Sequence, residues 1–283
     1  MIDTDFLNSL GRFSLIINKR ITSNYRGEKK SYSIGRGMIF KDHRIYAPGD
    51  DFRSIDWKVF ARTDHLYIKN YEEERTATVH VVVDKSASMN FGRPVSKFDY
   101  ASMIGVGFAY LGTKDNSKVQ FATFSDDTEI FQPRRGISQT LAMVQYLNSI
   151  KPQGYSNLND ALNKYRCYLT SRSYVVLISD FLIDMKEIKS CLWHLAKTEA
   201  KVVQVLDPVE KNFSLAGDFD MKDSETSVKL RSFVTPRLKS HYLQALEAHS
   251  KEIEKECLSL GLDFYQITTD TPIFDAFFSM LTS

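Results

Sequence analysis

The fold of this chain is decided by one stretch, Val79-His80-Val81-Val82-Val83-Asp84-Lys85-Ser86-Ala87-Ser88-Met89. Its apolar, β-branched run predicts a buried strand of a parallel sheet. The Asp-x-Ser-x-Ser pattern then places Asp84, Ser86 and Ser88 in the loop beyond the strand's carboxyl end, where open α/β sheets bind their ligands. One carboxylate and two hydroxyls form an all-oxygen set that suits a hard cation such as Mg²⁺. The alternative interpretation is a strand-to-helix turn in which the same side chains bond to nearby amides.

Further strands and helices alternate through the remainder of the chain after residue 77. Apolar runs predict strands at residues 118–124, 128–131, 173–179, 201–206 and 262–267, of which 128–131 is a short antiparallel return at the edge. Helical spacing predicts helices near 98–111, 138–150, 184–197, 236–260 and 271–281, and a further helix is expected to begin near Leu158. Residues 208–236 interrupt this alternation and predict a β-hairpin insertion that turns near 224–227.

Composition excludes several classes of protein. The chain has 283 residues, 43% of them apolar, which is ample for a globular core. A formal net charge of +2 does not by itself call for nucleic acid or an anionic membrane. Its three cysteines are far apart and do not suggest disulfides or a zinc site. No apolar run is long enough to span a membrane, and Asp3 and Asp5 are unlike a secretory signal, so we expect a cytoplasmic protein.

The first 76 residues form a separate part of the pattern. A helix is predicted at residues 3–19, and a basic run follows at 19–41, for which a solvated loop is favoured over a nucleic-acid patch. Residues 44–62 carry alternating charges that predict ion pairs in a mostly irregular segment, and 65–76 predicts a strand leading into the central fold. We expect residues 1–76 to pack on the domain formed by residues 77–283.

Residues 35–62 and the loop after the first predicted strand carry the motifs of a known family. They are Gly35-Arg-Gly-x-x-Phe40, Arg44-x-Tyr-x-Pro-Gly-Asp-Asp-x-Arg-x-Ile-Asp-Trp57, Ala61-Arg62 and the Asp-x-Ser-x-Ser-Met that ends at Met89. With them the chain resembles the bacterial and archaeal family of domain of unknown function fifty-eight, DUF58, over nearly its whole length. Ile39 stands where that family usually has an acidic residue. The resemblance implies a von Willebrand factor A-like fold, in which helices cover both faces of a mostly parallel six-stranded sheet.

A metal-ion-dependent adhesion site is also implied by this resemblance. Ser156 matches the hydroxyl of its second loop, for which the alternative is an N-cap, and Asp180 matches its third loop, for which the alternative is an Asp-turn. The implied ligand set is therefore Asp84, Ser86, Ser88, Ser156 and Asp180, with Mg²⁺ as the cation and Mn²⁺ or Ca²⁺ as alternatives. Members of the family are typically encoded beside MoxR-type AAA+ ATPases, which makes such an ATPase the implied partner.

Three classes of function remain open. The chain has no Gly-x-x-x-x-Gly-Lys phosphate loop, no His-Glu-x-x-His and no Gly-x-Ser-x-Gly elbow, and His80 lies inside a strand. The predicted site thus has cation ligands without an evident nucleophile or proton shuttle. This favours a binding module that takes an acidic side chain of a partner protein, and not an enzyme. A Mg²⁺-dependent hydrolase is the alternative, and a nucleic-acid binder is the third. We expect Asp84→Ala to leave the sheet largely intact, because Asp84 is predicted to lie beyond the strand.

Overall fold

The computed structural model describes residues 6, 9–11, 38–73, 78–170, 173–213, 217–222 and 229–282. Within residues 38–42, 69–73, 217–222 and 229–234 it describes the backbone alone. The chain divides into two compact units: Met1–Lys30 together with Ala77–Ser283, and Ser31–Thr76. The larger unit holds the main sheet and the predicted site.

The main sheet confirms the predicted mostly parallel α/β architecture. Its strand order is β10-β7-β6-β3-β4-β5, and all neighbours are parallel except β4 and β5, which pair antiparallel at one edge. The strands are β3 (Thr78–Asp84), β4 (Lys118–Phe124), β5 (Thr128–Ile130), β6 (Ser173–Ser179), β7 (Glu199–Leu206) and β10 (Asp263–Thr268). The stretch that begins at Val79 therefore forms an inner strand, between β4 and β6.

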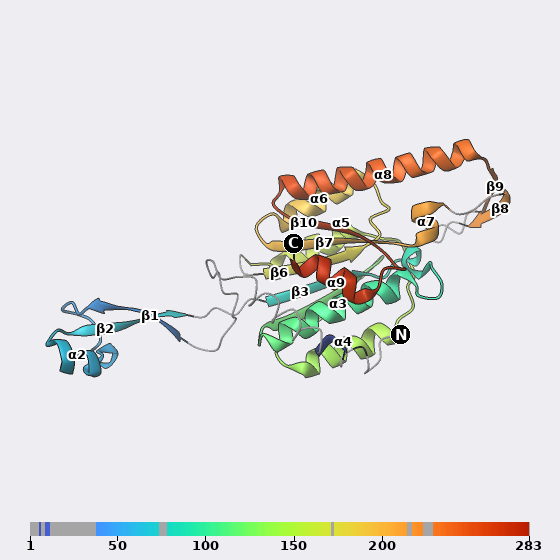
Figure 1. Ribbon diagram of the computed structural model, residues 1–283. Coiled ribbons are helices and arrows are strands. Elements are labelled where there is room, and N and C mark those ends of the chain that lie inside the picture. The colour runs from blue at the N-terminus through green and yellow to red at the C-terminus, as the bar shows by residue number, and fades with distance from the viewer. Residues whose placement is uncertain are drawn as a thin grey trace. The chain divides into compact units, whose positions relative to one another are not determined.

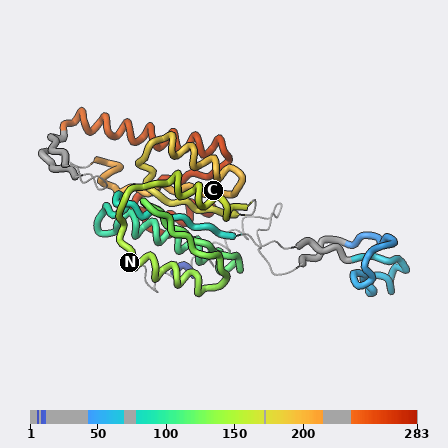
Figure 2. Tube along the Cα trace, turned by 180° about the vertical axis from the view of Figure 1, so that it is seen from behind, coloured from blue at the N-terminus to red at the C-terminus, as the bar shows by residue number. Residues whose placement is uncertain are grey.

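Helices cover both faces of this sheet (Figure 1). The helices of the larger unit are α3 (Lys97–Lys114), α4 (Ile137–Ser149), α5 (Leu158–Tyr165), α6 (Met185–Leu195), α7 (Pro208–Asn212), α8 (Pro236–Ser259) and α9 (Ile273–Thr282). Because side chains alternate along a strand, Val81 and Val83 pack with α3, α4 and α9, while Val82 packs with α5, α6 and α8. The long α8 runs over the second of these faces, and the view from behind shows the same arrangement (Figure 2).

Two features of the larger unit were only partly foreseen. The predicted hairpin is present as β8 (Gly217–Lys222) paired antiparallel with β9 (Lys229–Val234), and its predicted turn lies outside the described residues. The short helix α7 comes before it and was not predicted. At the N-terminus, Phe6 and residues 9–11 are helical and Leu10 is buried in the core, whereas the rest of the helix predicted at 3–19 lies outside the described residues, as does most of the basic run at 19–41.

The smaller unit is more regular than the sequence indicated. Strand β1 (Met38–Ile45) pairs antiparallel with β2 (Tyr67–Glu73), and the helix α2 (Trp57–Thr63) lies between them in sequence. The predicted strand at 65–76 is thus present, but it pairs with β1 and not with the main sheet. One predicted ion pair forms between Arg44 Nη2 and Asp50 Oδ1, at 2.6 Å. Asp56 instead caps α2 and contacts His43.

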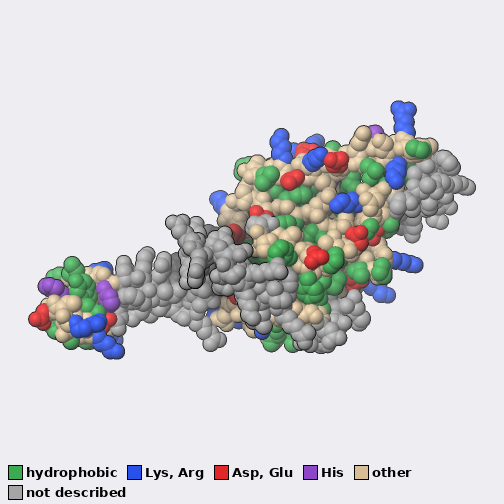
Figure 3. Space-filling model, viewed as in Figure 1, with side chains coloured by type: hydrophobic (Ala, Val, Ile, Leu, Met, Phe, Trp, Pro, Cys, Tyr) green, Lys and Arg blue, Asp and Glu red, His purple; other side chains and the backbone are tan. Residues whose placement is uncertain are grey.

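The length and apolar character of the described helices bear on whether any of them could span a membrane. Among the described residues, no helix combines the length and the apolar character that crossing a bilayer requires. On the face of the larger unit drawn in Figure 3, acidic and basic side chains are interspersed among apolar ones.

Candidate metal site at the carboxyl edge of the sheet

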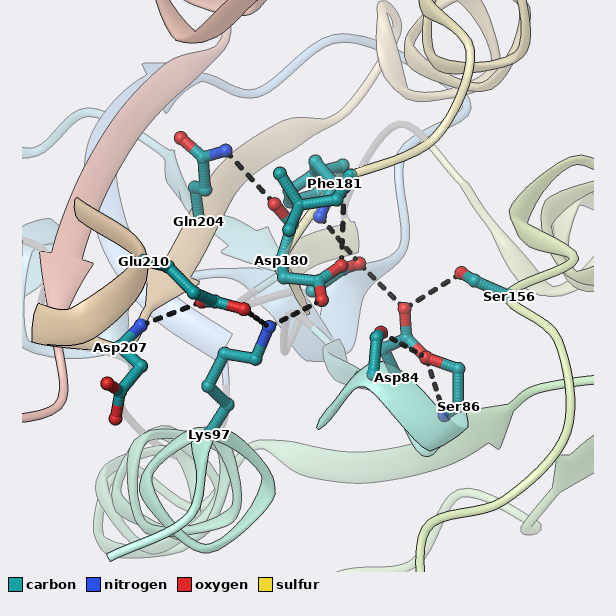
Figure 4. Close-up of polar contacts among 12 residues, drawn as sticks. Asp84, Ser86, Lys97, Ser156, Asp180, Phe181, Gln204, Asp207 and Glu210 are labelled. Atoms are coloured by element: carbon teal, nitrogen blue, oxygen red, sulfur yellow. Dashed lines mark hydrogen bonds and ion pairs between the residues drawn. The ribbon is translucent and has the colours of Figure 1, made fainter. Parts of the chain in front are cut away.

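Asp84 is the centre of the candidate site (Figure 4). It is the last residue of β3, and none of its surface is exposed. Its Oδ1 atom accepts a hydrogen bond from the Ser86 backbone amide at 2.8 Å. Its Oδ2 atom accepts hydrogen bonds from the Ser156 hydroxyl at 2.9 Å and from the Ser179 hydroxyl at 2.7 Å. Asp84 thus joins all three loops that the sequence singled out.

The first and second loops are held together by backbone hydrogen bonds. The Ala87 amide donates to the Gly154 carbonyl at 2.9 Å, and the Gln153 amide donates to the Lys85 carbonyl at 2.8 Å. Gly154 has a φ of +85°, and a Cβ there would collide with the carboxylate of Asp126, so glycine is required at this crossing. This clamp brings the hydroxyl of the second loop up to the carboxylate of the first.

Two hydroxyl positions are settled by these contacts. The Ser86 and Ser88 hydroxyl oxygens lie 3.1 Å apart. The N-cap of α5 is Asn157, whose side chain accepts a hydrogen bond from the Asp160 amide. The N-cap interpretation of Ser156 is therefore wrong, and its hydroxyl is directed at Asp84 instead. Ser156 and Ser88 are both partly exposed, whereas Ser86 is fully buried.

The third loop turns sharply after β6. Asp180 is buried, its Oδ1 accepts from the Leu182 amide at 3.2 Å, and its carbonyl accepts from Gln204 Nε2 at 3.0 Å. Phe181 follows with a φ of +53°, which is uncommon for a side chain of this size. The turn is held by the complete burial of Phe181 and by a 2.7 Å hydrogen bond between its carbonyl and His249 Nε2. Asp180 therefore does form the alternative Asp-turn, but with its Oδ1 atom alone.

The other oxygen of Asp180 contacts a lysine that sequence reasoning missed. Lys97, the first residue of α3, has a fully buried side chain. Its Nζ atom lies 2.8 Å from Asp180 Oδ2 and 2.7 Å from Glu210 Oε1, and Figure 4 shows it pointing between the two carboxylates. Glu210 belongs to α7, where it forms a capping box with Asp207. A cation in the first turn of a helix is unfavourable, because that end of the helix dipole is positive. The position of Lys97 was therefore the one signal in the sequence that anions lie near it.

The electrostatics of this edge are those of crowded, buried carboxylates. Burial and, next, the charge of Asp180 raise the pKa of Asp84, and the hydrogen bonds from Ser179 and Ser86 lower it; the net result is a pKa of about 6. Burial lowers the pKa of Lys97, but the charges of Asp180 and Glu210 outweigh burial and leave the pKa above its ordinary value. A positive charge beside Asp84 would relieve the cost of ionising it.

The residues that the structure gathers fit a hard cation. Their donor atoms are carboxylate and hydroxyl oxygens from separate loops, which is the chemistry that Mg²⁺ takes. No group of three or more His, Cys, Asp or Glu side chains suited to a metal occurs in the described part of the chain, so the oxygen set gathered here consists mostly of hydroxyls. Four of the five predicted ligands, Asp84, Ser86, Ser88 and Ser156, are linked by hydrogen bonds, whereas Asp180 contacts Lys97.

Each of the three loops also presents one large apolar side chain to solvent. Phe91 follows the first loop and is 45% exposed, Tyr155 precedes Ser156 and is 50% exposed, and Leu182 follows the third loop and is 42% exposed. We call these three the loop hydrophobics. An exposed apolar side chain on each of the three loops is available to a protein partner that contacts these loops together.

His80 belongs to the core. It is 1% exposed, and its ring nitrogens lie 2.9 Å from the Tyr165 hydroxyl and 2.9 Å from the Ser173 hydroxyl. Burial lowers the pKa of His80 to about 4. It is therefore neutral at neutral pH, as expected for a core residue within a strand.

Sheet order and helix placement define an α/β domain in which helices cover both faces of a mostly parallel six-stranded sheet. The chain belongs to the family described as protein of unknown function DUF58, whose model matches residues 42–252. The Mycobacterium tuberculosis protein named Uncharacterized protein Rv1480 is 25% identical over 273 residues, covering 95% of this chain and 86% of that protein.

Solved structures similar to this chain include BatB from Bacteroides thetaiotaomicron, a conserved hypothetical protein. It is 16% identical, has a TM-score of 0.45, and the match covers 73% of this chain and 97% of that one. The von Willebrand factor domain of the type V pili tip protein Mfa5 from Porphyromonas gingivalis is 11% identical with a TM-score of 0.38, and the match covers 74% of this chain and 96% of that one.

Proposed function

We propose that this protein is a metal-dependent protein-binding adaptor whose carboxyl-edge site recognises an acidic side chain of a partner protein. The observation that carries the proposal is the meeting of Asp84, Ser86, Ser88 and Ser156 in one hydrogen-bonded group, in which Ser88 and Ser156 are partly exposed. Bound there, Mg²⁺ would supply a coordination position for the partner's carboxylate, because this ion seldom takes all its ligands from one protein.

The loop hydrophobics extend this proposal to the residues that flank the partner's acid. Phe91, Tyr155 and Leu182 come from the same three loops as the candidate ligands, so a partner that reaches the site also meets them. Buried aromatic contacts at the centre of an interface carry much of its affinity. The proposed ligand is accordingly an acidic residue with apolar neighbours on the partner's surface.

A MoxR-type AAA+ ATPase is the proposed partner, and family resemblance is the reason for naming it. The chain has no phosphate loop of its own, so ATP-driven work in protein assembly, maturation or remodelling would come from that ATPase. The adaptor would contact the ATPase, or a client protein that the ATPase remodels, through the carboxyl-edge site.

Binding of the purified ATPase to this protein tests the proposal. Binding is measured in Mg²⁺ and in EDTA for the wild type, Asp84→Asn and Tyr155→Ser. The matched control is Trp193→Ser on α6, because Trp193 is 67% exposed and lies on a helix outside the three loops. Loss of binding in EDTA and in both site variants, with the control unchanged, is the expected result.

Two results would overturn the proposal. Equal binding in Mg²⁺, in EDTA and by Asp84→Asn would refute a metal-bridged contact. Hydrolysis of a phosphoester by the purified protein with Mg²⁺, lost in Asp84→Asn, would replace the adaptor with a metal-dependent hydrolase.

A further inference from the structure

The side chain of Lys97 places a charged ammonium in the interior of the protein. Lysine is among the residues least often fully buried, and a buried charge is tolerated only when it is paired. Here one ammonium contacts two carboxylates, Asp180 and Glu210, from elements far apart in the sequence. Lys85, the other lysine near the site, pairs with Asp127 and Glu129 instead. Among the described residues, Lys97 is therefore the cation that contacts the third loop of the site.

Asp180 cannot serve Lys97 and a divalent ion equally. One of its oxygens accepts from Lys97 Nζ at 2.8 Å and the other accepts from the Leu182 amide at 3.2 Å. A divalent ion bound directly by Asp180 would share this carboxylate with the Lys97 ammonium, and the two cations would repel each other across it. Turning the carboxylate away from Lys97 would separate a buried ion pair. Asp84 has no such competitor, because its three partners are hydroxyl and amide donors without net charge.

We infer that Lys97 is a resident counter-cation that holds Asp180 and so weakens the binding of divalent ions at the carboxyl-edge site. This inference rests on the proposed function and adds a regulator of its affinity. It divides the five predicted ligands into two groups: Asp84 and the three serines bind the ion, while Asp180 is withheld by Lys97. Affinity is then set by a residue that never touches the ion.

A set of four proteins tests this division: the wild type, Asp180→Asn, Lys97→Met and the double variant. Binding of Mg²⁺ alone is measured by calorimetry, and the shift of the thermal midpoint between EDTA and Mg²⁺ is measured in parallel. The matched control is Lys201→Met, because Lys201 pairs with Asp263 and Tyr265 near the opposite ends of the strands.

The expected results follow from the competition for Asp180. Asp180→Asn alone changes the Mg²⁺ affinity by less than about threefold, because the charge of Asp180 is already paired with Lys97 and does not act on the ion. Lys97→Met lowers the midpoint in EDTA, and it binds Mg²⁺ about tenfold more tightly with a larger stabilisation by the ion. The double variant loses that gain, and Lys201→Met binds Mg²⁺ as the wild type does.

A tenfold loss of affinity in Asp180→Asn alone would overturn the inference, since Asp180 would then be a ligand in the wild type. Unchanged affinity in Lys97→Met would also overturn it. If Lys97→Met does not fold, Asp180→Asn alone decides between the two accounts. Absence of Mg²⁺ binding in the wild type and in every variant would overturn the metal site itself and this inference with it.

Discussion

Acid should weaken the fold through His80, and His80→Gln should remove that effect. A glutamine side chain can still bond with the Tyr165 and Ser173 hydroxyls but does not titrate. The folded-state pKa of His80 is about 4, against 6.5 for an exposed histidine. Between these values the unfolded chain binds a proton that the folded chain does not, so His80 contributes stability above pH 6.5 that is lost as the pH falls toward 4.

The size of the effect follows from the same two pKa values. At about 1.4 kcal/mol for each pKa unit, the full loss is about 3 kcal/mol, of which about 2.5 kcal/mol falls between pH 7.5 and pH 4.5. The assay is denaturant unfolding of the wild type and of His80→Gln at both pH values in EDTA. Asp84 has a raised pKa, so its contribution to the unfolding free energy changes with pH in the opposite direction. Subtracting the pH-dependent change of His80→Gln from that of the wild type removes this contribution, because both proteins contain Asp84. An equal fall in the unfolding free energy of both proteins would refute this reasoning.

Two further predictions concern packing. Gly107→Ala should lower the unfolding free energy by about 1–2 kcal/mol, because a Cβ on this face of α3 would overlap the ring of Phe277 on α9; a raised midpoint in thermal unfolding would contradict this. The prediction that residues 1–76 pack on the domain of residues 77–283 stays a prediction, and limited proteolysis tests it: ready release of 1–76 from an intact remainder would show it to be wrong.

The position of the candidate site could be predicted from the sequence, because its residues lie at the carboxyl ends of strands that the sequence pattern shows. The carboxyl ends of parallel strands meet at one edge, so Asp84 and Asp180 were expected to be neighbours once β3 and β6 were recognised. The placement of Asp84 beyond the strand was wrong, since it is the last residue of β3 and accepts three hydrogen bonds. Asp84→Ala would leave those donors without a partner at a cost of about 1–3 kcal/mol each, so Asp84→Asn is the better test.

The parts that the sequence did not predict depend on contacts between distant residues. Lys97 meets Asp180 and Glu210 across separations of 83 and 113 residues, and no local pattern encodes such pairs. Ser179 was hidden because it ends an apolar strand, where its hydroxyl has no periodic signature. The two glycines Gly105 and Gly107 lie on the same helix, yet Gly105 faces Val81 of the sheet and Gly107 faces Phe277 of α9.

The account depends most directly on whether Asp84 and the serine hydroxyls bind a divalent ion. Calorimetric titration of Mg²⁺ into the wild type and into Asp84→Asn at pH 7.5 tests this. The predicted result is saturable binding by the wild type with a dissociation constant of about 1 mM or tighter, and binding at least about tenfold weaker by Asp84→Asn, which has lost the central carboxylate. Equal binding by the two proteins, or no binding by the wild type at millimolar Mg²⁺ and Mn²⁺, would contradict the central claim.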